Sequence, residues 1–405
     1  MSTLRLSAAV LLLAATSLST YASLSVDCLL RGTCIDSSKV LGHLQQLQNI
    51  ATANEGNRAA GTSGHELSAN YVAQQLLAVG FRVEMQPFNF LKFTKLSASF
   101  SQSAPTAVTY VESEHFNVLR YSASGQIAGQ AIQEVDLALG AGNTSTSGCE
   151  ASDFEGFTAG NVALIQRGTC TFQQKLENAQ AAGAVGVIFF NQGDTTDREA
   201  LFSSTLGEST AVTIPAISVP YQLGVGLRDT AASVQLAIVT SVESKTSFNV
   251  IAETRTGNPD NIVMVGAHLD SVPEGPGIND NGSGSAGILE IALQMKNLKP
   301  TNKVRFAWFS AEELGLIGST KYVESLTAEE KAKIALMVNV DMIGSPNHKI
   351  AVYDGDGSRF GLQGPAGSDV IERKFHEFFG STGIQSVETE MNGRSDYAAF
   401  AAAGI

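Results

Sequence analysis

The stretch "NIVMVGAHLDSVPEGPGINDNGSGSAG", residues 261–287, carries the clearest signal for the fold. An apolar run typical of a buried strand leads into a loop rich in Gly and Pro, and an amphipathic helical pattern, "SAGILEIALQMKNL", begins where the loop ends. Strand and helix patterns then alternate through "KVRFAWFS", "ELGLIGSTKYVESL", "IALMVNVDM" and "KIAVYDG". Apolar strands separated by amphipathic helices predict an α/β fold, with a mainly parallel sheet covered by helices on both faces.

Ionisable side chains gather where three of these predicted strands end, which is the edge at which such sheets bind ligands. They are one histidine and five carboxylates: His268, Asp270, Asp280, Glu312, Glu313 and Asp341. These groups cannot share a pocket as bare charges, because like charges about 4 Å apart repel by several kcal/mol even at an effective dielectric near 20. Zinc accepts His, Asp and Glu as ligands, and a surplus of carboxylates suits two ions with one carboxylate between them. The sequence therefore predicts a metal site, and the glycines around Asp280 let that side chain approach both ions.

Other interpretations of the same residues are weaker. A single acidic residue at a strand end is more often a helix cap or a solvated loop residue, but six such groups at three strand ends favour the metal site. Gly282, Gly284 and Gly287 spell G-x-G-x-x-G, yet a long loop separates them from the strand and no acidic residue follows at the required distance, which disfavours dinucleotide binding. The sequence has neither a G-x-S-x-G elbow nor a P-loop, which disfavours a serine hydrolase or an NTPase.

Composition bounds the class of protein. The chain has 405 residues, enough for two domains or for one large domain with an insertion, and 43% of them are hydrophobic, so it can form a core. Its formal net charge is −13 and it has no basic runs, which argues against binding to nucleic acid or to an anionic membrane.

The first 22 residues, "MSTLRLSAAVLLLAATSLSTYA", have the pattern of a cleaved secretory signal, and the alternative of an uncleaved anchor is disfavoured by the short apolar stretch. We therefore expect a secreted protein, extracellular or in a periplasmic or vacuolar space, without membrane contact after cleavage. Four cysteines in an exported chain favour two disulfides. Neighbourhood in the sequence suggests Cys28 with Cys34 and Cys149 with Cys170, one of three possible pairings.

The character of the chain changes at about residue 111 and again at about 243. Between these points Gly, Ser and Thr dominate, and "GNVALIQRGTCTFQQKLENAQAAGAVGVIFFN" predicts a strand, a helix closed by Gly183 and a second strand. We therefore expect an inserted domain over 111–242, and a discontinuous main domain formed by 23–110 and 243–405.

Several motifs in both parts of the chain resemble those of a known family. "GAHLDS", "GINDNGSGSAG", "FAWFSAEELGLIGS" and "NVDMIGSPN" resemble the zinc aminopeptidase family that includes bacterial leucyl aminopeptidases and the vacuolar aminopeptidase Y. The middle segment, with "GNVALIQRGTC", "AGAVGVIFFN" and "TIPAISVP", is similar to the protease-associated (PA) domain that this family often carries as an insertion. The resemblance spans about residues 37–405. It implies a zinc-exopeptidase fold, a mainly parallel mixed sheet between helices as in phosphorylase/hydrolase-like proteins, with a β-rich α/β PA domain inserted.

The resemblance also implies a role for each site residue. Asp280 would bridge two zinc ions, His268 and Asp341 would complete one of them, and Glu313 with a second histidine would complete the other. Asp270 would hold the far nitrogen of the ligand histidine. In the implied mechanism Glu312 is the general base, and Arg394 in "GRSDYAAF" lies near the substrate carbonyl, where a plain surface salt bridge is an equal alternative.

One position departs from the family pattern. The second zinc's histidine belongs after the segment "SDYAAFAAAGI", in which this sequence stops at Ile405, and His348 is only a weak substitute. The expectation is a truncated chain that lacks one zinc ligand and the last strands of its sheet.

The predicted function is a secreted metallo-aminopeptidase that removes N-terminal residues from peptide or protein substrates, with two zinc ions per complete chain. The alternatives are a carboxypeptidase of the same fold, and an inactive truncated or binding form. The sequence does not indicate the residue preference or the oligomeric state.

Overall fold

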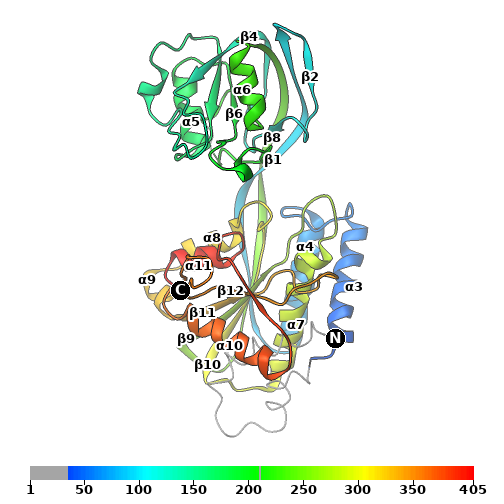
Figure 1. Cartoon of the computed structure of the whole chain (residues 1–405). Helices are drawn as coiled ribbons and strands as arrows, with labels where there is room; N and C mark the ends of the chain where they lie inside the picture. The colour runs from blue at the N-terminus through cyan, green and yellow to red at the C-terminus, as the bar shows by residue number, and fades with distance from the viewer. Residues whose placement is uncertain (1–34, 209–210) are drawn as a thin grey trace. The chain divides into compact units, whose positions relative to one another are not determined.

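A computed structural model describes residues 35–208 and 211–405 of the chain (Figure 1). The expected signal peptide and the expected Cys28–Cys34 pair lie outside the described residues. The chain divides into two compact units. The first contains the described residues up to Phe90 together with Lys245–Ile405, and the second is Leu91–Ser244, within which the expected insertion 111–242 lies.

The central sheet of the first unit brings together strands from distant parts of the sequence. Its order is β11 (Ile334–Asn339), β9 (Asn258–His268), β10 (Asn302–Phe309) and β8 (Ser233–Glu253), and β1 (Arg82–Ala104) also pairs with β8. β9 is parallel to both of its neighbours, whereas β10 pairs antiparallel with the end of β8. The predicted parallel arrangement is therefore correct for the three strands that carry the candidate ligands, and the sheet as a whole is mixed.

Successive side chains of each strand point to opposite faces of the sheet, and both faces of this sheet are buried. On β10, Val304, Phe306 and Trp308 pack in one core cluster, whereas Ala307 and Phe309 pack in another. Helices cover both faces: the first cluster draws on α3 (Ser37–Ala53), α4 (Ser63–Ala78), α7 (Gly284–Gln294) and α10 (Ser368–Ser381), and the second on α8 (Ile317–Ser325) and α11 (Tyr397–Ala402). The short α9 (Ala328–Ala332) precedes β11. α3, α4 and α7 lie side by side (Figure 1).

One predicted strand lies outside the central sheet. "KIAVYDG" forms β12 (Ala351–Tyr353), which pairs in parallel with β13 (Val387–Thr389) in a separate two-stranded sheet. The expectation that it continues the main alternation is wrong. Its pattern explains the difference: only Val352 of the three strand residues is buried, whereas a central strand is buried on both faces.

The second unit contains the predicted strand-helix-strand segment. Its strands run in the order β8, β4 (Gly125–Val135), β5 (Val162–Gln166), β6 (Gly186–Phe190), β7 (Ala216–Val219) and β3 (Asn117–Val118), and β2 (Val108–Tyr110) pairs with β1. β5 and β6 are parallel, and α5 (Phe172–Ala181) connects them and is followed by Gly183 at φ +88°. α6 (Tyr221–Asp229) follows β7.

A disulfide joins Cys149 and Cys170, which confirms that predicted pairing. Within the described ranges, none of the helices combines the length and apolar character that a membrane span requires.

Candidate metal centre

The strand order places the predicted ligands at one edge of the sheet. His268 at the end of β9 stands opposite Phe309 at the end of β10, and Gly266 stands opposite Asn339 at the end of β11. Because β9 lies between the other two strands and is parallel to both, the residues that follow all three strands emerge next to one another. This arrangement confirms that the three strands are immediate neighbours.

His268 is the centre of the cluster. Its side chain is 1% exposed, and its Nε2 lies 3.1 Å from Asp280 Oδ1, 3.5 Å from Asp341 Oδ1 and 3.9 Å from Glu312 Oε2. Its main chain is also held in place, because the Ser285 hydroxyl donates to the His268 carbonyl at 2.6 Å. One imidazole nitrogen therefore faces carboxylates that come from three different loops.

Asp270 lies behind the imidazole and is fully buried. His268 Nδ1 is 3.2 Å from the Asp270 carbonyl oxygen and 3.5 Å from Oδ1. The Asp270 carboxylate also accepts the backbone N–H of Glu312 at 3.2 Å and that of Glu313 at 3.3 Å. Asp270 thus contacts both the histidine and the turn that carries the two glutamates, and this second contact was not predicted from the sequence.

The loop that carries Asp280 is anchored by its neighbour Asn281. The Asn281 amide donates to the Val340 carbonyl and accepts the N–H groups of Gly284 and Met342. The sharp turn before it requires Gly277, which has φ +57° and where an added Cβ would stand 2.3 Å from the Asp280 carbonyl oxygen. The loop is therefore fixed relative to the end of β11.

Asp341 is oriented by a residue that sequence reasoning missed. The Ser395 hydroxyl donates to Asp341 Oδ2 at 2.7 Å and accepts a hydrogen bond from Asn339. The other oxygen, Oδ1, is buried, has no hydrogen-bond partner and faces His268 Nε2. Left-handed backbone at Ala311 (φ +58°) and Met342 (φ +51°) adjoins Glu312 and Asp341, and such strain commonly marks functional sites.

A positive charge would stabilise the ionised carboxylates of this cluster. Burial raises the pKa of Glu312 to about 9, with Asp396, Asp341 and Asp270 adding to the rise against the effect of His268. The pKa of Glu313 is raised to about 7, mainly by burial and next by the negative charge of Asp280. For His268 burial lowers the pKa, but the surrounding carboxylates outweigh it and raise the pKa well above its ordinary value. A cation bound in the cluster would oppose the rise at the two glutamates and favour their ionised form.

Two sets of donor atoms are close enough to hold such a cation, because in each set the atoms lie within 4.8 Å of one another. They are His268 with Asp280 and Asp341, and His268 with Glu312 and Glu313. The nitrogen and oxygen donors suit zinc, and the partnerless Asp341 oxygen is the kind of atom that a metal would satisfy. Among the described residues, His268 is the only histidine in either set.

Two other acidic groups lie elsewhere in the first unit: Asp354 with Asp356 and Glu372, and Glu372 with His376 and Glu388. In the first of these, all three carboxylates accept N–H groups of the loop at residues 355–360. This pattern fits a role in holding that loop.

The last predicted site residue, Arg394, is exposed, and its backbone N–H donates to the Asn392 side chain. The structure therefore places Arg394 next to Ser395 and not among the buried charges. Asp396, two residues later, is fully buried, and this burial raises its pKa to about 7. It was not predicted from the sequence, although its electrostatic effect reaches Glu312.

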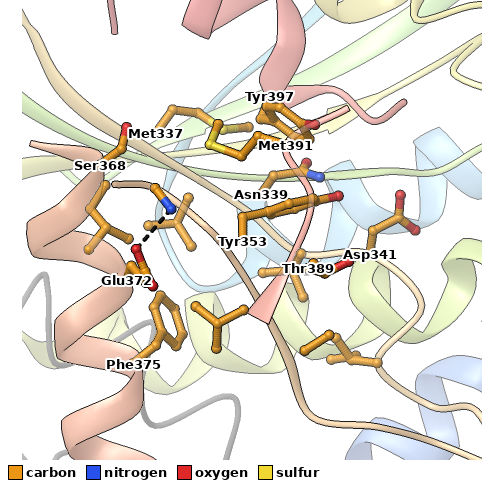
Figure 2. A pocket seen from close by; sticks show the side chains of 17 residues that line it. Met337, Asn339, Asp341, Tyr353, Ser368, Glu372, Phe375, Thr389, Met391 and Tyr397 are labelled. Atoms are coloured by element: carbon orange, nitrogen blue, oxygen red, sulfur yellow. Dashed lines mark hydrogen bonds between the residues drawn. The ribbon is translucent and has the colours of Figure 1, made fainter. Parts of the chain in front are cut away.

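A cavity of about 210 Å³ opens beside Asp341. Figure 2 shows Asp341 at one side of this cavity, whose lining also includes Tyr353, Thr389, Met391 and Tyr397. Apart from Asp341 and Glu372, the lining carries no charged side chain among the described residues.

Comparison with known proteins identifies the family of both domains. Residues 249–405 match peptidase family M28, and residues 133–227 match the PA domain. The chain is 54% identical over 375 residues to an aminopeptidase of Pseudomonas aeruginosa, covering 92% of this chain and 70% of that protein. It is 41% identical to a probable lipoprotein aminopeptidase of Mycobacterium tuberculosis, over 92% of this chain and 73% of that one.

Solved structures show the same relationship. An aminopeptidase from Aneurinibacillus has a TM-score of 0.71 at 28% identity, and a zinc aminopeptidase from Bacillus subtilis has 0.58 at 29%; each match covers 91% of this chain and 83% of the other. These matches confirm the resemblance seen in the sequence. The chain belongs to the aminopeptidases of peptidase family M28 and carries a PA domain.

Proposed function

We propose that this protein is an exported aminopeptidase whose catalytic centre binds two zinc ions. The observation that carries the proposal is the convergence of His268, Asp280 and Asp341, including a buried oxygen of Asp341 that has no hydrogen-bond partner among the described residues. The Bacillus subtilis relative is described as a zinc aminopeptidase, which supports zinc as the ion.

Each zinc would take different residues. His268 and Asp341 would hold one ion, Glu313 would hold the other, and Asp280 would contribute to both. The separations of 3.1 Å and 3.5 Å from His268 Nε2 to Asp280 and Asp341 support this first set of ligands. The side chain of Asp280 is 45% exposed.

The protein's own residues supply the proton transfers. When bound, zinc polarises the substrate carbonyl and makes water more acidic. Glu312 accepts a proton from the attacking water and donates it to the nitrogen of the leaving amine. Its turn is held by Asp270, which keeps the Glu312 carboxylate facing the cluster. Arg394, at the exposed edge beside Ser395, stabilises the carbonyl oxygen as it gains negative charge.

The acidic surplus explains why the enzyme would act at the amino end of a peptide. A free α-ammonium group is attracted by the cluster, whereas a terminal carboxylate would be repelled. The cavity beside Asp341 offers an apolar surface for the side chain of the N-terminal residue.

Export is supported by two features. The pattern of residues 1–22 is that of a secretory signal, and the Cys149–Cys170 disulfide suits an oxidising compartment. Peptides or proteins with free amino ends would be the substrates.

The Glu312→Gln variant tests the assignment of the general base. We expect kcat on a leucyl anilide to fall by about 10²-fold or more, since a positioned base contributes about 10²- to 10⁴-fold. Zinc content should stay unchanged, because Glu312 is not assigned as a ligand. Glu324→Gln, an exposed glutamate paired with Lys321 on α8, is the matched control and should keep full activity. Wild-type kcat in Glu312→Gln would refute the assignment.

A further inference from the structure

Arg58 is a buried cation that the mechanism leaves without a role. It lies between α3 and α4, is 0% exposed, and is among the largest fully buried side chains of the described residues. Its guanidinium donates through Nη1 to the Leu269 carbonyl, through Nε to the Pro276 carbonyl at 2.9 Å and through Nη2 to the Gly277 carbonyl at 2.8 Å. One planar group therefore satisfies three main-chain oxygens.

These three carbonyls belong to the two ends of one loop. Leu269 immediately follows His268, and Gly277 is three residues before Asp280. The backbone of Arg58 strengthens the link, because its N–H donates to the Ser271 hydroxyl at 2.9 Å and its carbonyl accepts the Ser271 N–H at 3.3 Å. The guanidinium thus fixes the distance between the segments that carry two proposed zinc ligands.

The charge of Arg58 is retained in this buried position. Burial lowers its pKa to about 10, while Asp270, Asp280 and Glu313 act in the opposite direction. It is therefore a cation at neutral pH, close to the acidic cluster. All of its side-chain hydrogen bonds within the described residues go to main-chain oxygens, so the carboxylates remain available to a metal.

We propose that Arg58 is a positioning residue of the zinc site, which sets zinc affinity by clamping the loop between His268 and Asp280. The proposal rests on the proposed function. The clamp requires the planar fork of arginine, because the compact ammonium group of lysine cannot reach three carbonyls in one plane. A clamp and a simple countercharge predict opposite effects. Loss of the clamp weakens zinc binding, whereas loss of a nearby positive charge alone strengthens it.

The variants Arg58→Lys and Arg58→Met separate these effects. We expect Arg58→Lys to weaken zinc binding by about 10- to 100-fold, the usual range for residues that orient metal ligands, as measured by competition with a chelator. The absorption spectrum of the cobalt-substituted protein should change as the ligand geometry loosens. Arg58→Met should bind zinc at least as weakly as Arg58→Lys does. Tighter zinc binding in Arg58→Met than in the wild type would overturn the proposal.

Arg305→Lys is the matched control, since Arg305 is a half-buried arginine of the same unit that pairs with Glu253 and Tyr322. It should lower thermal stability without changing zinc affinity or the cobalt spectrum. If it weakened zinc binding as much as Arg58→Lys does, the effect would be general destabilisation and the proposal would fail.

A milder variant covers the case in which Arg58→Lys does not fold. Ser271→Ala removes the hydroxyl that accepts the Arg58 N–H. It should weaken zinc binding in the same direction by a smaller factor, and unchanged affinity would contradict the proposal. A wild-type protein that binds no zinc would instead refute the proposed function itself.

Discussion

The carboxylate of Asp270 offers a sharp test of how the site is held together. In the Asp270→Asn variant the side-chain volume is kept, but the charge and one acceptor oxygen are lost. Asp270 now accepts the N–H groups of Glu312 and Glu313, one on each oxygen. An asparagine can accept only one of them, because its other polar atom is an N–H donor.

The expected loss of activity in Asp270→Asn follows from these contacts. A hydrogen bond to a charged acceptor contributes about 1.5–3 kcal/mol, and one such bond is lost within a fully buried site. At about 1.4 kcal/mol for each factor of ten, kcat/KM should fall by about 10- to 100-fold. Zinc affinity should also decrease, since the same carboxylate faces His268 Nδ1 at 3.5 Å.

Asp354→Asn is the matched control. Asp354 is likewise fully buried, but its Oδ2 alone accepts two backbone N–H groups, those of Arg359 and Phe360, so its asparagine variant loses the negative charge beside them and keeps the acceptor. Both variants should lower the unfolding temperature, but only Asp270→Asn should lower zinc affinity and kcat/KM on a leucyl anilide. Equal catalytic losses in the two variants, or no loss in Asp270→Asn, would refute the reasoning.

Two further predictions concern single contacts. Ser395→Ala removes the donor to Asp341 Oδ2 and should weaken zinc binding by about tenfold, measured by chelator competition, because a bond to a charged group contributes about 1.5–3 kcal/mol; unchanged affinity would exclude this orienting role. In the second unit, burial lowers the pKa of Lys175 from its ordinary value of 10.5 to about 8, while its ammonium donates to the carbonyls of Ser147 and Gln166. Between those pH values the unfolded chain binds more protons than the folded one. The contribution of Lys175 to the free energy of unfolding should therefore increase as the pH rises. Denaturant titrations at pH 7.5 and 10 should show this contribution in the wild type and not in Lys175→Met; the same pH dependence in both proteins would contradict it.

The strands and their carboxyl ends were predictable because their signals are local. The apolar runs of β9, β10 and β11 each mark a buried strand; His268 ends the first of them, and the other proposed ligands lie in the segments that follow. β12 was wrongly assigned to the central sheet because its short apolar run has the composition of a central strand, although only one of its residues is buried.

The contacts that hold the glutamate turn, Asp341 and the loop before Asp280 were not predictable, because they join residues that are far apart in the sequence. Asp270 is 42 residues from Glu312, Ser395 is 54 from Asp341, and Arg58 is 211 from Leu269. Pattern and spacing give no sign of such pairs. Ser395 and Asp396 did lie within the segment "GRSDYAAF" that drew attention to Arg394, so the right segment was found although the more informative side chains in it were not.

The most direct test of the two-zinc centre is the zinc content of the Asp280→Asn variant, compared with the wild type and with Asp341→Asn, after dialysis against a fixed concentration of free zinc. If Asp280 contributes to both ions, as proposed, its variant should lose both, whereas Asp341→Asn should lose only the ion assigned to Asp341 and His268. Leucyl anilide hydrolysis should fall in parallel with zinc content. Wild-type zinc content in Asp280→Asn would contradict the bridging role on which the proposed centre depends.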